Sequence, residues 1–195
     1  MSQRTADRPI HPLFLDRWSP RAFDASDLPE ADLMSIFEAA RWAPSAFNSQ
    51  PWRFLYSRRG DADWDRFLAL LIPFNQSWAH SASVLVYILS DSLPFTDKAG
   101  EPFASHSHSF DAGAAWLSLA LQATYMGYHA HGMTGVDFDR VRVELVVPDR
   151  FRIEAAVAIG RIGDPSILSE KLKAREVPSG RKPVAEIAFR GAFPG

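Results

Sequence analysis

The chain has 195 residues, of which 47% are hydrophobic and 23% charged, and its formal net charge at pH 7 is −2. This is the size and composition of one globular domain, and the near-neutral charge gives no attraction to nucleic acid or to an anionic membrane. The absence of cysteine excludes disulfides, thiolate metal sites, iron–sulfur clusters and cysteine nucleophiles, so any redox chemistry would depend on a cofactor.

The N-terminal residues 1–8 are not followed by the apolar stretch of a secretory signal. The most apolar segment, residues 112–123, is shorter than the ~20 residues that span a bilayer, and it contains Ser118 and Gln122. We therefore expect a cytoplasmic protein with neither a membrane nor a nucleic-acid partner, folded as a single domain over residues 1–195.

The first predicted helix begins at Pro29-Glu30 and repeats apolar residues at helical spacing. It should end near Ala43, because Pro44 disfavours helical geometry in the residue before it. Further elements are expected as a strand at 53–56, a helix at 61–71 and an apolar strand at 84–89 that is covered on both faces.

Asp111 is a plausible N-cap for a helix that runs to Gly127 and is apolar on nearly every side, so this helix should be buried in a core or between subunits. A short helix at 137–145 and a strand at 154–159, ended by Gly160, are predicted to follow. Regular βαβ alternation and a Gly-x-Gly-x-x-Gly turn are both missing, so the order of elements indicates an α+β fold around one sheet rather than a Rossmann fold.

Arg17, Ser19 and Arg21 alternate along a segment that Pro20 favours as extended, which would project all three side chains to one side. Two guanidiniums and a hydroxyl form a receptor for a phosphate dianion, although solvated surface arginines are the commoner explanation. A second cationic pair, Arg181 and Lys182, could converge on the same group from the other half of the sequence.

The turn from Pro44 to Pro51 has small residues that would let a planar ligand approach the backbone, and its amides at Asn48 and Gln50 match the mixed edge of a flavin pyrimidine. A well-capped loop explains the same residues. Asn75 is a further amide candidate or an ordinary helix C-cap. The segment Gly132–Gly135 is either a simple turn or a source of backbone N–H groups for an acceptor nitrogen such as flavin N5.

Two histidine pairs, His106/His108 and His129/His131, could each place two imidazoles on one face of a strand. Neither pair has a third ligand at an expected spacing, so we expect no metal. The sequence also contains no Gly-x-Ser-x-Gly motif and no Walker A loop.

The order of these motifs resembles the nitroreductase family. Arg-x-Ser-x-Arg comes first, followed by Pro-Ser-x-x-Asn-x-Gln-Pro-Trp after the first long helix, which is the most specific part. The likeness continues through Asn75, the Asp111-Ala112-Gly113 start of the buried helix, the Gly135 turn and the terminal Arg-Lys-Pro, and it spans about residues 11–188.

The resemblance implies FMN as cofactor and assigns its binding residues. Arg17 and Ser19, within the segment that includes Trp18, would hold the phosphate with Arg181 and Lys182. Arg21 and Asn75 would meet the pyrimidine edge, and the backbone N–H of Thr134 or Gly135 would meet N5. The partner subunit of an intertwined homodimer would supply its own copies of Pro44, Ser45 and Asn48, with the buried helix at the interface.

Three departures from the family pattern concern the same site. Ala46 stands where relatives often have a second serine, Trp78 where some have a lysine aimed at the flavin, and Ser179 near a position that is sometimes basic. Lys182 would substitute for that basic residue, and Arg21 would act alone where the lysine is missing.

The implied fold is a central mixed or antiparallel sheet flanked by helices. The implied activity is transfer of hydride from NAD(P)H through flavin N5 to a nitroaromatic, a quinone or an activated alkene or carbonyl, by a ping-pong mechanism in which FMN carries the chemistry. Alternatives are a flavin-binding sensor or carrier without turnover, and a dehalogenating, flavin-fragmenting or desaturating enzyme of the same fold. A metal hydrolase built on the histidine pairs is a more distant possibility.

Overall fold

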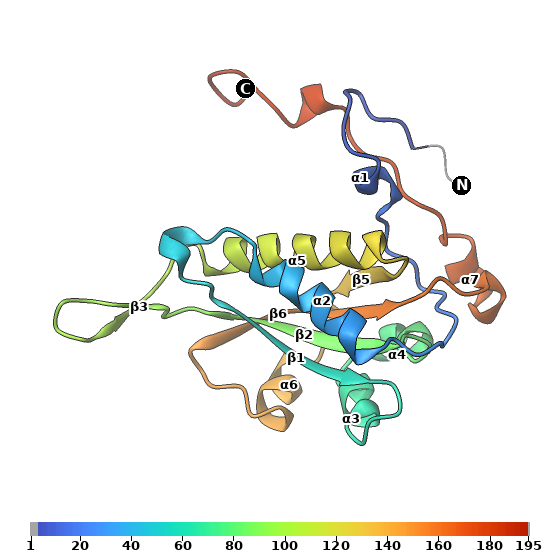
Figure 1. Cartoon of the computed structure of the whole chain (residues 1–195), viewed down its shortest axis with the longest axis horizontal. Coiled ribbons are helices and arrows are strands. Elements are labelled where there is room, and N and C mark those ends of the chain that lie inside the picture. Colours follow the sequence, from blue (N-terminus) through green and yellow to red (C-terminus); the bar gives the residue numbers. More distant parts are fainter. Residues whose placement is uncertain (1–3, 195) are drawn as a thin grey trace.

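Residues 4–194 are described by a computed structural model, and their centre is a four-stranded antiparallel sheet (Figure 1). Its strands lie in the order β1 (Trp52–Arg58), β2 (Val84–Asp91), β6 (Phe151–Gly160) and β5 (His129–Met133). Every neighbouring pair is antiparallel. The α+β class and the sheet flanked by helices are therefore confirmed.

Helices cover both faces of this sheet. One face packs against α2 (Glu30–Arg41) and α5 (His108–Tyr125), and the other against α3 (Trp64–Ala69), α4 (Pro73–Ala79) and α6 (Phe138–Glu144). Strand β2 is buried along its whole length because its side chains alternate between the two cores. Val84, Val86 and Ile88 join the α2/α5 core, while Leu85, Tyr87 and Leu89 join the other.

The start of α5 differs from the prediction. The helix begins at His108, so Asp111 lies in its first turn and is not the N-cap. Its buried carboxylate accepts hydrogen bonds from the Ser107 hydroxyl and from the backbone N–H of Ala46, which ties the 44–51 turn to the helix. The end of α5 is as predicted, because Gly127 takes a left-handed φ of +80° just beyond the last turn.

The remaining elements agree with the sequence in part. Helix α2 ends at Arg41, and α6 carries the N-cap Asp137, whose side chain accepts from the Arg140 N–H. Helix α3 is shorter than the predicted 61–71, because Asp61 bonds back to the Arg58 N–H in a turn. Helix α4 and strand β5 were not predicted.

A β-bulge interrupts the pairing of β2 with β6. Ile88 pairs with Ala155 and Leu89 with Ile153, so Glu154 has no partner on β2. A bulge residue breaks the alternation of side chains along its strand. Ile153 and Ala156 thus both face the α3/α4/α6 core, while Glu154 and Ala155 both line a cavity on the α5 side.

The smaller elements lie at the edges. They are α1 (Leu13–Asp16), the pair β3 (Phe95–Thr96) and β4 (Pro102–Phe103), α7 (Glu170–Lys173), and short 3-10 turns at Ala46–Asn48, Pro165–Ile167 and Val184–Glu186. The two terminal segments lie side by side beyond the α5 layer, where the Asp7 carboxylate accepts the Val184 N–H (Figure 1). Over residues 4–194, no helix combines the length and the apolar character needed to cross a bilayer.

Candidate functional site

A cavity of about 610 Å³ lies along α5, on the face of the sheet formed by β5 and β6. Six of its lining residues, from Ser109 to Ala120, belong to α5, and these span roughly 16 Å at 1.5 Å per residue. Most of the wall is apolar. The polar and charged lining side chains are Arg17, Ser19, Ser109, Thr134, Glu154 and Arg181.

Arg17, Ser19 and Arg181 meet at this cavity although they come from opposite ends of the sequence. The Arg17 Nη1 lies 3.4 Å from the Ser19 Oγ, and Arg181 bonds to the carbonyls of Ser179 and Gly180. Burial, followed by the neighbouring cations Arg181 and Arg4, lowers the pKa of Arg17 below its ordinary value. Neither Arg17 nor Arg181 forms an ion pair with a carboxylate of residues 4–194.

This cluster of cations fits an anionic ligand. Repulsion among three arginines is unfavourable unless a negative group lies between them, and a dianion would gain charge-assisted hydrogen bonds from each. Arg4 was not predicted as a site residue. Its guanidinium donates to the carbonyls of Leu15 and Arg17, and so holds the segment that carries Arg17, Ser19 and Arg21 (the receptor segment) in place.

Arg21 and Trp18 lie beside the cavity, in an adjoining hollow of about 380 Å³. The Arg21 guanidinium is 3.7 Å from the Glu176 carboxylate, whose other oxygen accepts the backbone N–H groups of Arg21 and Ala22. Its charge already has a partner, unlike that of Arg17. Trp18 makes an edge contact with the ring of His129, at 6.3 Å between ring centroids.

Lys182 is not brought to the α5 cavity. It lines a separate hollow between the N-terminal and C-terminal segments, which it shares with Arg181, Arg4 and Asp7. Of the predicted basic pair, Arg181 lines the α5 cavity and both neighbouring hollows, whereas Lys182 lines only the hollow between the terminal segments.

Asn75 and Gly135 lie in contact. The Asn75 side-chain N–H donates to the Gly135 carbonyl at 3.0 Å from the first turn of α4, so Asn75 is not a C-cap. A Cβ at position 135 would lie 2.4 Å from the Asn75 Nδ2, so only glycine permits this approach. Only the second half of the predicted turn at 132–135 lies outside a strand. Gly132 and Met133 belong to β5, and Thr134 and Gly135 follow it.

The turn that carries Pro44, Ser45 and Asn48 does not line the cavity within one chain. The Ser45 Oγ accepts the Gln50 N–H at 3.0 Å, and Phe47 is 94% exposed. Phe47, Asn48 and Gln50 have φ values of +51°, +55° and +47°, an unusual concentration of left-handed backbone for residues other than glycine. Ala46, the position of the missing serine, contributes its N–H to Asp111.

Of the two histidine pairs, one lies on a strand as predicted and the other does not. His106 and His108 are not on a strand, because His108 is the first residue of α5. His129 and His131 do share a face of β5, and burial lowers the pKa of His131 to about 4. The His131 Nδ1 lies 2.8 Å from the Pro20 carbonyl, which pins the receptor segment to β5. Among residues 4–194, no group of three potential metal ligands is found.

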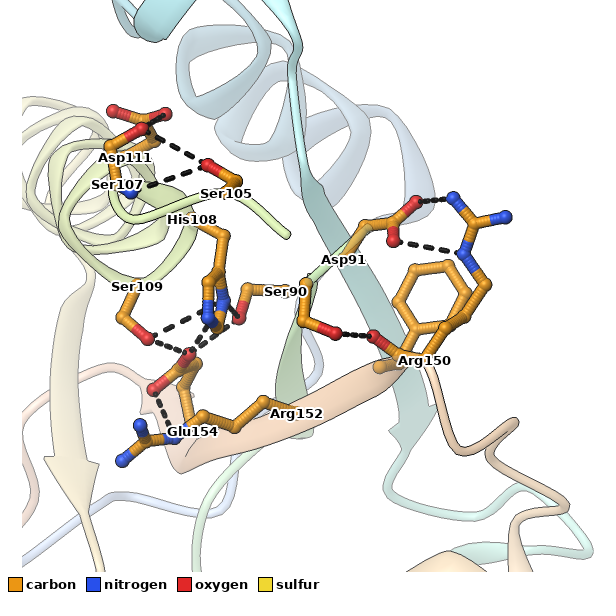
Figure 2. Close-up of polar contacts among 12 residues, drawn as sticks. Ser90, Asp91, Ser105, Ser107, His108, Ser109, Asp111, Arg150, Arg152 and Glu154 are labelled. Carbon is orange, nitrogen blue, oxygen red and sulfur yellow. Dashed lines mark hydrogen bonds and ion pairs between the residues drawn. The ribbon is translucent and has the colours of Figure 1, made fainter. Parts of the chain in front are cut away.

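Trp78 is fully buried and does not point to a ligand. Its ring lies 4.6 Å from that of His131 and 6.5 Å from that of Phe23, as part of the α3/α4/α6 core. A polar cluster formed by Ser90, His108, Ser109 and Glu154 was not predicted from the sequence (Figure 2). Ser109 and Glu154 of this cluster line the cavity. The one available signal was Ser90, the first polar residue after the apolar run of β2.

Comparison with known proteins places this geometry in context. Residues 15–77 and 62–161 match the model of the nitroreductase family. A crystal structure described as an oxidoreductase containing FMN is 53% identical, with a TM-score of 0.96 over 98% of this chain and 96% of that one. An NADH dehydrogenase of Thermus thermophilus is 30% identical over 84% of this chain and 91% of its own length. The CLA biosynthesis enone reductase of Lactiplantibacillus plantarum is 24% identical, with corresponding shares of 84% and 90%.

Proposed function

The chain belongs to the nitroreductase family, and from this premise we propose that it is an FMN-dependent oxidoreductase that transfers hydride from NAD(P)H to an electron-poor acceptor. The observation that carries the proposal is the group of arginines without carboxylate partners at the entrance to a largely apolar cavity. A phosphate joined to a flat, apolar ring system is the kind of ligand that such a cavity fits. The similarity to an FMN-containing oxidoreductase at 53% identity supports the same assignment.

In this proposal Arg17, Ser19 and Arg181 hold the FMN phosphate, and Trp18 flanks them. Arg4 supports the receptor by binding the carbonyl of Arg17. Lys182 belongs to the approach to the site rather than to the cavity itself, because it lines only the neighbouring hollow. The pKa of Arg17 is lowered first by burial and then by the neighbouring cations Arg181 and Arg4. A bound phosphate would offset the repulsion from these two cations.

The flavin ring is proposed to lie along β5. The backbone N–H of Thr134 or Gly135 would donate to N5, and Asn75 would orient this backbone through its bond to the Gly135 carbonyl. Arg21 would provide positive charge near the pyrimidine, moderated by Glu176. FMN when bound supplies the hydride transfer itself, while the protein residues bind it, orient it and exclude water.

We also propose a homodimer in which each subunit completes the other's site. One face of α5 exposes Phe110, Leu117 and Tyr125 by 80%, 45% and 76%, at a spacing of about two helical turns. An exposed apolar stripe of this kind is typical of an interface. Pro44, Ser45 and Asn48 lie at the N-terminal end of the same helix, through the bond from Ala46 to Asp111, and would contact the partner's FMN.

A visible absorbance spectrum of the purified protein tests the proposal. We expect flavin bands that bleach anaerobically on addition of NADH or NADPH and return with an enone, a quinone or a nitroaromatic. A protein that stays colourless after reconstitution with FMN would contradict the cofactor assignment. Flavin bands that neither reductant bleaches would contradict the activity.

A further inference from the structure

The α5 cavity has a polar wall that FMN binding, as proposed, does not use. Figure 2 shows Glu154 of β6 next to His108 and Ser109 of α5 and Ser90 of β2. The hydroxyls of Ser90 and Ser109 both donate to the Glu154 Oε1, at 2.5 and 2.6 Å. The His108 Nδ1 lies 2.7 Å from the Ser90 Oγ. Side chains of two elements, β2 and α5, thus donate to one carboxylate oxygen of a third element, β6.

The β-bulge is what brings this carboxylate to the cavity. Without the extra residue in β6, Glu154 and Ala155 would face opposite sides of the sheet, whereas here both line the cavity together with Thr134. Among the described residues of the lining, Arg17, Arg181 and Glu154 carry charge, so Glu154 is the single acid there. Bulges of this kind are frequent beside active sites, where they redirect a side chain.

The hydrogen bonds that join His108, Ser90 and Glu154 all run in one direction. The Ser90 hydroxyl has one hydrogen, which it donates to Glu154, so the hydrogen between Ser90 and His108 must come from the imidazole. His108 is therefore the Nδ1–H tautomer when neutral. The continuous path His108 Nδ1–H, Ser90 Oγ–H, Glu154 Oε1 is an arrangement along which a proton can move by one step at each bond.

Within residues 4–194, the other charged residues near this cluster do not contact the Glu154 Oε1, the oxygen at the end of the path. Arg152 lies on the other carboxylate oxygen, with its Nε 3.4 Å from the Glu154 Oε2. Asp111, one turn further along α5, is engaged by Ser107 and the Ala46 N–H. The pair of Asp91 and Arg150 is separate from the cavity lining.

The geometry points to Glu154 as the group that delivers the proton to the acceptor, with Ser90 and His108 as its proton supply. This rests on the proposed function, which provides the hydride. In the resting site Glu154 is a carboxylate that accepts hydrogen bonds from the Ser90 and Ser109 hydroxyls. The His108 imidazolium first passes its Nδ1 proton to Ser90 as Ser90 passes its own proton to Glu154. On an activated alkene the hydride then forms a C–H bond at one carbon, the π pair moves to the neighbouring carbon, and that carbon takes the proton from Glu154, which returns to the carboxylate. One hydride and one proton are added in all, and His108 regains its proton from solvent.

Separate measurement of the two half-reactions tests this assignment in the FMN-loaded protein. In Glu154→Gln, bleaching by NADH should stay within about twofold of wild type, because hydride transfer to the flavin requires no proton from Glu154. Reoxidation by ferricyanide, which takes electrons alone, should also be unchanged. Reoxidation by 2-cyclohexen-1-one should slow by about 100-fold, the size typical of a lost general acid.

Asp91→Asn is the matched control, because it removes a carboxylate of β2 that is also paired with an arginine but lies outside the cavity. It should leave all three rates unchanged. Equal enone rates in Glu154→Gln and wild type would overturn the assignment, as would a wild-type protein that ferricyanide reoxidises but the enone does not. Failure of NADH to bleach wild type would instead count against the proposed function.

A second readout does not depend on turnover. In protein labelled with ¹⁵N-histidine, the neutral form of His108 should show the nitrogen shifts of the Nδ1–H tautomer. Ser90→Ala should remove this preference. A His108 that carries its proton on Nε2 in wild type would break the path and overturn the proposal, whatever the kinetic result.

Discussion

The properties of single side chains in this protein depend on which neighbours they find. Arg17 and Arg21 are two positions of the same alternating motif, yet Arg21 is paired with Glu176 while Arg17 faces Arg181 and Arg4. The first environment stabilises a cation, and the second favours an anion from outside. The motif therefore contains Arg17, the proposed phosphate-binding residue, and Arg21, whose ion pair with Glu176 also supports the fold.

Arg17→Ala should weaken FMN binding by about 10- to 100-fold, since a charge-assisted bond contributes roughly 1.5–3 kcal/mol. Fluorescence titration of the FMN-free protein measures this. Riboflavin, which lacks the phosphate, is the matched ligand and should bind the variant and wild type equally. An equal loss for both ligands would place Arg17 at the ring rather than at the phosphate. The exposed Arg190 provides a control position.

His131 makes stability depend on pH. Burial lowers its pKa from 6.5 to about 4, so between these values the unfolded chain binds a proton that the folded chain does not. The stabilisation is fully present above pH 6.5 and is lost as the pH falls toward 4. From pH 7 to 5, wild type should lose about 2 kcal/mol more than His131→Gln, as measured from urea unfolding. The exposed His80 is the control position, and a His131→Gln variant with the wild-type pH dependence would contradict the prediction.

At the scale of elements, the segment that follows β5 is held by α4. The Gly135 carbonyl accepts both the Ile72 backbone N–H and the Asn75 side chain. The same close approach leaves no room for a side chain at position 135. Helix α4 therefore positions the backbone that is proposed to meet N5.

Gly135→Ala should destabilise the protein by about 1–3 kcal/mol, the usual cost of inserting a methyl group into a packed site. The added Cβ would lie 2.7 Å from Ile72 as well as against Asn75, so α4 must shift. Chemical denaturation measures the loss. Gly180→Ala, where no atom lies within 4 Å of the added Cβ, should be neutral, and equal stability of the two variants would contradict the account.

The sequence predicts an element when the apolar pattern that stabilises it lies within its own residues, and fails when the element depends on pairing with another strand. Strands β1, β2 and β6 and helix α2 are marked by their own apolar patterns, and these predictions were confirmed. Strand β5 has two histidines and a glycine among its five residues, so only its pairing with β6 reveals it. Glu154 escaped notice as a site residue because a bulge is a property of two paired strands rather than of one sequence.

At the scale of the whole molecule, residues from both ends of the sequence meet at one cavity. Arg17 and Ser19 are brought to Arg181 as the motif order indicated, whereas Pro44, Ser45 and Asn48 remain outside within a single chain. The resemblance implied that these three residues serve the partner's site, and their place outside the cavity of their own chain is compatible with that expectation. The proposed dimer accounts for both this separation and the exposed stripe on α5.

Phe110→Asp should therefore convert a dimer to monomers and reduce FMN retention, because it places a charge in the apolar stripe of α5 without altering the cavity lining. Sedimentation velocity measures the change in mass. Val143→Asp is the matched control, since Val143 is 76% exposed on α6, across the sheet, and should leave the dimer intact. A Phe110→Asp protein that sediments as the wild type does would exclude this face as the interface.

The bulge in β6 also bears on how this protein can change over evolutionary time. Deletion of the Glu154 codon would leave Ile153 opposite Leu89 and Ala155 opposite Ile88, as an uninterrupted ladder. An indel in the middle of a core strand, which would normally shift every following side chain to the wrong face, is thus tolerable at this one position. A relative aligned with a one-residue gap here would keep the sheet and lose the acid.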